Sequence, residues 1–167
     1  MKLRLLLFKD CNRKCPGCCN KDWDLDNLPI CNSFKEYEEI ILTGGEPMLK
    51  PDLILKVIDK IKEENPTAKI IMYTAFLNSP KLIEIVNKLD GITFTLHEQK
   101  DVNIALKNLI ILNHRYSKKS LRLNVFKNIN LKGITLNNWK IKDNIVWIKN
   151  CPLPKGEILM KLKKEDK

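Results

Sequence analysis

Short apolar runs recur along the chain and predict a series of β-strands. The runs cover residues 2–8, 39–43, 69–74, 91–96, 121–126 and 144–148. Several of them are almost continuously apolar instead of alternating with polar residues. This pattern is typical of strands in a parallel sheet that helices cover on one face.

Helical patterns lie between most of these runs. Apolar side chains recur at helical spacing over residues 53–61, over 82–89 behind a Ser-Pro start, and over about 102–113. Ser33 and Glu36 have the spacing of a capping box, so we expect a short helix there as well.

The alternation of strands and helices predicts an α/β fold with right-handed parallel crossovers. A closed barrel of eight βα units typically needs about 250 residues, whereas this chain has 167. We therefore expect an open partial barrel of five or six βα units. Residues 1–150 would form this domain, and residues 151–167 a C-terminal extension with a solvated basic tail.

The segment CNRKCPGC places Cys11, Cys15 and Cys18 directly after the first predicted strand. Three thiolates on one loop can hold three irons of a four-iron, four-sulfur cluster and leave the fourth iron open. A structural zinc site needs four ligands, and the remaining candidates, Cys31 and Cys151, stand alone. The spacing favours an iron–sulfur site over zinc, with reactive thiols as a third reading.

A further cysteine, Cys19, follows Cys18 at once, so the cysteines alone leave the third ligand ambiguous. The N-terminal apolar run is too short for a secretory signal and leads into charged residues. We therefore expect free thiols and no disulfides.

A second motif, IILTGGEP, carries an apolar strand directly into a turn with two glycines. Paired glycines allow positive φ and a close approach of the backbone to a ligand. A Gly-Gly turn by itself is more often a simple connection between a strand and a helix. Its position after the cysteine loop makes it informative.

Together, CxxxCxxC after the first strand and GGEP after the second closely resemble the radical S-adenosylmethionine (radical SAM) superfamily, over residues 2–147. The resemblance implies that Cys11, Cys15 and Cys18 bind a [4Fe-4S] cluster, and the family spacing selects Cys18 over Cys19. It also implies that SAM binds the open iron through its amino and carboxylate groups. Reduction would then release methionine and a 5′-deoxyadenosyl radical, which abstracts hydrogen from a substrate.

The same resemblance implies that the methionyl end of SAM meets Gly44, Gly45, Glu46 and Pro47. One position departs from the family pattern. The residue before the third cysteine is usually aromatic and lies near the adenine, but here it is Gly17. Contacts to the adenine must therefore come from elsewhere in the chain.

Polar residues follow or interrupt the later strands, where active sites of such folds gather. We expect Thr74, His97 and Asn124 to contact SAM, with Glu98 beside them. For Trp147 we expect ordinary core packing.

The formal net charge of +10 and pI of about 9.3 favour phosphate-bearing partners, although a Lys- and Asn-rich composition also reflects AT-rich coding. We expect a cytoplasmic enzyme with no membrane partner, acting on a small molecule or nucleotide. An electron donor such as flavodoxin or ferredoxin would supply the reducing electron. The alternatives are an activating enzyme with a glycyl-radical partner protein, and a noncatalytic iron–sulfur or zinc module. An electron carrier has no use for a methionine-binding turn, so GGEP disfavours the last alternative.

Overall fold

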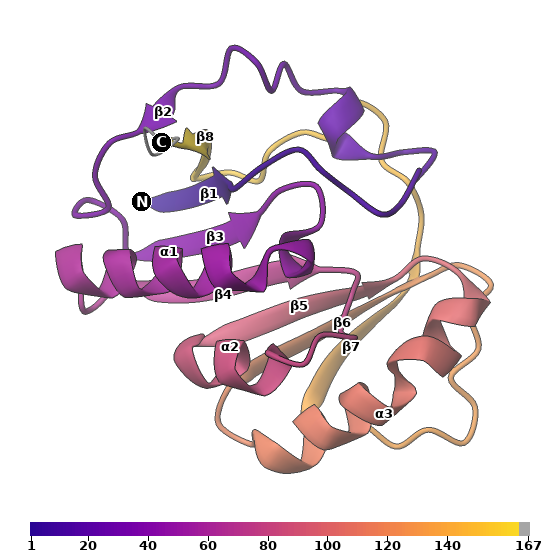
Figure 1. The fold of residues 1–167 in the computed structure, drawn as a ribbon. Coiled ribbons are helices and arrows are strands. Elements are labelled where there is room, and N and C mark those ends of the chain that lie inside the picture. Colours follow the sequence, from indigo (N-terminus) through magenta and orange to yellow (C-terminus); the bar gives the residue numbers. More distant parts are fainter. Residues whose placement is uncertain (164–167) are drawn as a thin grey trace.

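A computed structural model describes residues 1–163 and contains one sheet in which every neighbouring pair of strands is parallel (Figure 1). The strand order is β2-β8-β1-β3-β4-β5-β6-β7. This confirms the expected α/β fold with an open parallel sheet. The strands are β1 (Lys2–Leu6), β2 (Ile30–Cys31), β3 (Glu39–Thr43), β4 (Lys69–Thr74), β5 (Gly91–Leu96), β6 (Ser120–Phe126), β7 (Trp139–Ile145) and β8 (Glu157–Leu162).

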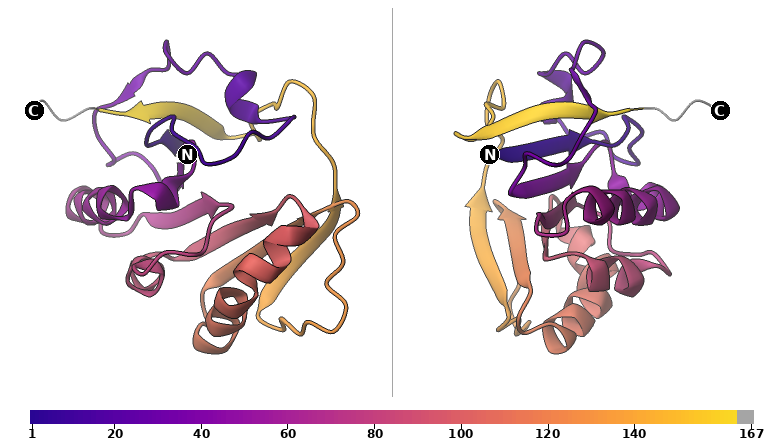
Figure 2. Two further views of the ribbon diagram at one scale, coloured as in Figure 1. Left: turned by 45° about the vertical axis from the view of Figure 1, so that its right-hand side comes forward. Right: turned by 90° about the vertical axis from the view of Figure 1, so that its left-hand side faces the viewer.

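Three α-helices, α1 (Pro51–Glu64), α2 (Leu82–Lys88) and α3 (Gln99–Arg115), cover one face of the sheet (Figures 1 and 2). They connect β3 to β4, β4 to β5, and β5 to β6. Among the described residues, these three connections are the ones that contain an α-helix, whereas five or six βα units were expected. None of these helices is long and apolar enough to cross a membrane.

The hydrophobic core lies between the sheet and these helices. Alternate strand residues point to the helices, because side chains in a strand alternate between the two faces. The buried strand residues on the face toward the helices include Leu3, Leu5, Ile40, Leu42, Ile70, Met72, Ile92, Phe94, Leu121 and Leu123. The opposite, concave face carries Arg4, Thr43, Tyr73 and Thr95 and is left for other contacts.

The last predicted strand was placed wrongly. The strand β7 begins at Trp139 instead of residue 144. The indole Nε1 of Trp139 donates to the Leu109 carbonyl at 3.2 Å. The strand lies at the sheet edge and most of its side chains are exposed, so it lacks an apolar pattern. The apolar run that suggested a strand at 144–148 is largely exposed, with Val146 58% and Ile148 63% accessible.

The strand β8 lies in a segment for which the sequence predicted only an extension and a solvated tail. It pairs with β1 on one side and β2 on the other, so the first and last strands of the chain lie side by side in the sheet (Figure 2). The nearly buried Arg4 and Glu157 side chains fasten this contact through an ion pair of 2.7 Å. The rest of the predicted tail, residues 164–167, lies outside the described residues, and the division at residue 150 stays a prediction.

The helix expected from Ser33 and Glu36 does not form. Residues 32–38 are a loop that the end of α1 holds in place. The backbone N–H of Phe34 donates to Glu64 at 2.9 Å, and the Asn65 side chain donates to the Phe34 carbonyl at 3.1 Å. These contacts come from a distant segment and satisfy the loop without a helix.

Candidate functional site

The carboxyl ends of β1, β3, β4 and β5 meet at one edge of the sheet, because these strands are parallel and adjacent. The segments that follow them enclose a cavity of about 210 Å³. The cavity brings together most of the predicted site, namely Cys11, Cys15, Cys18, Gly44, Gly45, Glu46, Thr74 and His97.

The three cysteines of the CxxxCxxC motif are free thiols. Cys19 instead forms a disulfide with Cys151, with a Cα–Cα distance of 5.2 Å. The expectation of no disulfides was therefore wrong. The fold brings Cys151 next to Cys19 although the two are 132 residues apart in sequence. Since Cys19 is engaged, the free thiols left on this loop are those in the family spacing, with Cys18 as the third.

The three free thiols fit an iron–sulfur cluster in number and in ligand type. Soft thiolate ligands suit such clusters, and the cysteines share one cavity. Among the described residues, no group of three or more His, Cys, Asp or Glu side chains is already placed to hold a metal ion. Burial raises the pKa of Cys11 and of Cys15. Binding a cluster must therefore displace their protons.

The Gly-Gly turn clamps the beginning of the cysteine loop. Gly45 N–H donates to the Phe8 carbonyl and Glu46 N–H to the Asp10 carbonyl, both at 2.8 Å. A Cβ on Gly45 would lie 1.8 Å from the Asp10 oxygen. The glycine is thus required by close backbone contact. The positive φ that the sequence suggested does not occur at either glycine of this turn.

The side chain of Glu46 is only 2% exposed and joins the ends of β3 and β4. Its carboxylate accepts the N–H groups of Met48 at 3.0 Å and Ala75 at 2.8 Å, and the hydroxyl of Thr74. Burial raises the pKa of Glu46 even though these donors act against it. Glu46 and Thr74 therefore support the turn. Pro47 starts the short helix η2 (Pro47–Leu49) and does not line the cavity.

A second support, absent from the sequence-based predictions, is Asp101 in the first turn of α3. The carboxylate is 2% exposed, accepts the N–H groups of His97 at 3.0 Å and Glu98 at 2.9 Å, and pairs with Arg13 of the cysteine loop. Burial alone would raise the pKa of Asp101, but these donors hold it below its ordinary value. Asp101 stands three residues after Glu98, and this capping spacing was the available signal.

Removing the Asp101 carboxylate is expected to lower stability. Asp101→Ala should cost about 3 kcal/mol, because it leaves Arg13 without its buried partner. The contribution should be present above about pH 4, the pKa range of an unfolded Asp, and be lost as the pH falls through the lower folded pKa. Urea unfolding at pH 7 and pH 3 measures both effects. Asp143→Ala, at an exposed position, is the matched control, and equal loss in the two variants would contradict this role.

His97 lies at the end of β5 in an aromatic group. Its ring stacks on Trp147, with centroids 5.3 Å apart and planes at 11°, and contacts Phe126 at 5.0 Å. Burial, and then the nearby Arg13, lower the pKa of His97, so the ring is neutral at neutral pH. Its Nδ1 is buried and has no hydrogen-bond partner among residues 1–163.

Two residues lie elsewhere than expected. Asn124 is half-buried on β6 opposite Thr95 and does not line the cavity, so its contact with SAM stays a prediction. Trp147 was expected in the core, but it is 37% exposed and lines the cavity. It lies beyond the end of β7, where the chain no longer packs under the helices.

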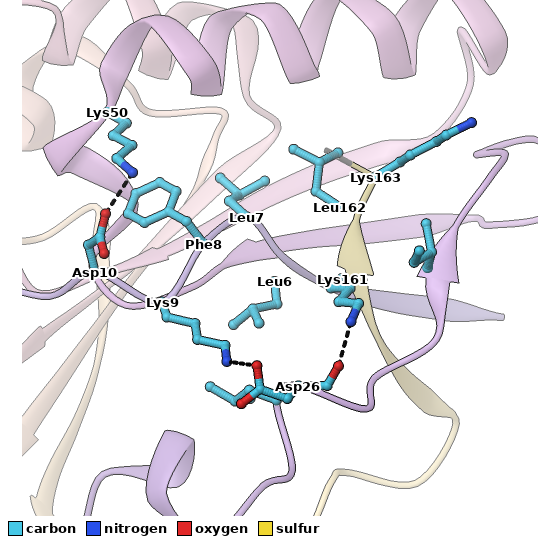
Figure 3. Close-up of a pocket in the computed structure, with 12 residues that line it drawn as sticks. Leu6, Leu7, Phe8, Lys9, Asp10, Asp26, Lys50, Lys161, Leu162 and Lys163 are labelled. Carbon is cyan, nitrogen blue, oxygen red and sulfur yellow. Dashed lines mark hydrogen bonds and ion pairs between the residues drawn. The ribbon is translucent and has the colours of Figure 1, made fainter. Parts of the chain in front are cut away.

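A larger cavity of about 740 Å³ lies beside the carboxyl ends of β1 and β8 (Figure 3). Apolar residues line it beside two ion pairs, Lys50 with Asp10 and Lys9 with Asp26. None of the three free loop cysteines borders this cavity. Its lining therefore offers no ligand set for an iron–sulfur cluster, and the smaller cavity is the candidate site.

A protein-family model described as a 4Fe-4S single cluster domain matches residues 2–102. The chain belongs to this family. The cluster domain is of the radical SAM type, and the matched residues include the three cysteines, the Gly-Gly turn and His97. Membership supports a 4Fe-4S cluster as the cofactor and disfavours zinc. A comparison with curated proteins finds no match.

Proposed function

We propose that this protein is a radical SAM enzyme that acts on a small-molecule or nucleotide substrate. The observation that carries the proposal is one cavity shared by three free cysteines and the backbone of the Gly-Gly turn. A cluster with three protein ligands leaves one iron for another molecule. The turn beside it offers backbone groups for an amino acid.

The chain's own residues would bind and orient the two cofactors. Cys11, Cys15 and Cys18 would hold the cluster, and the backbone at residues 44–46 would meet the methionyl group of SAM. The Asn20 side chain donates to the Gly44 carbonyl at 3.0 Å and fixes that part of the turn. When both are bound, the cluster and SAM supply a 5′-deoxyadenosyl radical for hydrogen abstraction.

His97 would contribute a hydrogen bond to a polar group of SAM. Its neutral ring borders the cavity, and its buried Nδ1 lacks a partner within the described chain. A buried polar atom gains when a ligand supplies the missing hydrogen bond. The ribose hydroxyls and the carboxylate of SAM are suitable partners.

The concave face of the sheet supports an anionic substrate. Asn124 pairs in register with Thr95 and Lys142, and Arg122 pairs with Lys140, so these side chains share the face that carries the cavity. Arg122, Lys140 and Lys142 are exposed, and they form no ion pair with another residue of the part of the chain that the structure describes. This basic strip favours a nucleotide.

A flavodoxin or ferredoxin would deliver the electron.

Formation of 5′-deoxyadenosine tests the proposal. Protein reconstituted with iron and sulfide without oxygen should release it from SAM when a strong reductant is added, even without substrate. Protein that lacks iron is the control and should release none. Cluster-loaded protein that binds no SAM, or leaves it intact, would contradict the proposal. A stable glycyl radical on a co-purified protein would show that the substrate is a partner protein and not a small molecule or nucleotide.

A further inference from the structure

Trp147 lies directly against the cysteine loop. A Cβ built on Gly17 would be 2.6 Å from the Trp147 Cβ and 2.7 Å from its Cγ and Cδ2. The Trp147 side chain therefore fills the space that a side chain at position 17 would take. Position 17 immediately precedes the third cysteine, so this space adjoins the cluster ligands.

The indole of Trp147 is held by two other rings. It stacks nearly parallel on His97, and it meets Phe126 at a centroid distance of 4.4 Å with a tilt of 46°. Trp147 is nevertheless 37% exposed. The contacts with His97 and Phe126 thus hold the indole in place in advance, which lowers the entropic cost of binding a planar ligand.

Trp147 also stands between two cavities. The first, of about 210 Å³, contains the free cysteines and the Gly-Gly turn, and the second, of about 530 Å³, lies beside it. Trp147, His97, Arg13 and Cys15 line both. A ligand held by its amino-acid end in the first cavity would pass Trp147 on its way into the second.

The segment that carries Trp147 is fastened to the cysteine loop. The Cys19–Cys151 disulfide joins the two, and the Trp23 indole donates to the Cys151 carbonyl at 3.0 Å. These ties hold Trp147 in a fixed place relative to the cluster ligands.

We infer that Trp147, which occupies the space that a side chain at position 17 would take, binds the adenine of SAM by stacking. The inference rests on the proposed function. Every base has a π-face that stacks on an aromatic side chain. The adenosine part would lie in the second cavity, with the amino-acid part at the Gly-Gly turn.

Binding of SAM and of methionine to the cluster-loaded protein, measured by equilibrium dialysis, tests this assignment. Trp147→Ala should weaken SAM binding about tenfold, as expected for one stacked base, and leave methionine binding and iron content unchanged. Trp147→Phe should retain most of the SAM affinity. Ile148→Ala, at the exposed neighbouring position, should bind SAM like the unaltered protein.

Unchanged SAM affinity in Trp147→Ala would overturn the inference while the proposed function stands. Loss of iron from this variant would also overturn the inference, because Trp147 would then be needed to hold the cysteine loop in its cluster-binding conformation. Failure of the unaltered, cluster-loaded protein to bind SAM would overturn both.

A double substitution tests whether position 17 and Trp147 share one space. Gly17→Phe alone should lower the melting temperature, because the new ring clashes with Trp147. Combined with Trp147→Ala, the same change should be tolerated and should restore part of the SAM affinity. Equal destabilisation by Gly17→Phe in both backgrounds would contradict the shared space.

Discussion

Replacing Cys15 with alanine is expected to remove the iron–sulfur cluster and leave the fold intact. The cluster needs three thiolates from the loop, and Cys15 is a half-buried loop residue outside the hydrophobic core. Anaerobic reconstitution should give about four irons and four sulfides per unaltered chain, and almost none in the variant. Circular dichroism and the melting temperature before reconstitution should be the same for both proteins.

Cys31→Ala is the matched control for this experiment. Cys31 is a buried thiol in β2 that donates to the Ser33 carbonyl at 3.3 Å, and it does not line the cavity. This variant should keep its full iron content. A complete cluster in Cys15→Ala, or its loss in Cys31→Ala, would show that the ligands are assigned wrongly.

Gly45→Val is expected to displace the cysteine loop from the Gly-Gly turn. Its Cβ would lie 1.8 Å from the Asp10 oxygen and 2.4 Å from the Lys9 oxygen, so backbone would have to move. Overpacking typically costs about 1–3 kcal/mol, and a clash with backbone should reach about 3 kcal/mol. Urea unfolding should show this loss, and reconstitution should show little bound iron.

Gly133→Ala serves as the control, because an added Cβ at this glycine would meet no other atom among the described residues. Gly133 has a φ of 82°, and no heavy atom lies within 4 Å of a Cβ placed there. The strained backbone should cost about 1 kcal/mol, with full iron content. Native stability and a full cluster in Gly45→Val would refute the clamp between the turn and the loop.

Elements with a strong local pattern were predictable. The strands at 39–43, 69–74 and 91–96 have the predicted bounds, because each is a buried apolar run. β7 was misplaced because its exposed, lysine-rich edge has no such pattern. The position of β8 beside β1 is a pairing of distant segments, which local patterns do not encode.

The candidate site divides in the same way. The cysteine motif and the Gly-Gly turn are contiguous in sequence, and the fold brings them together as expected. The ion pair of Arg13 with Asp101 spans 88 residues, and the Cys19–Cys151 disulfide spans 132. Such contacts depend on the tertiary fold, which brings distant segments together. They could not be predicted from the spacing of residues along the chain.

Electron paramagnetic resonance of the reduced cluster, with and without SAM, tests the three-cysteine site most directly. We expect a 4Fe-4S signal that changes on addition of one equivalent of SAM, because the open iron gains the amino and carboxylate groups as ligands. A signal that SAM leaves unchanged would contradict an open iron. Stoichiometric zinc without sulfide in protein purified without oxygen would contradict the cluster itself.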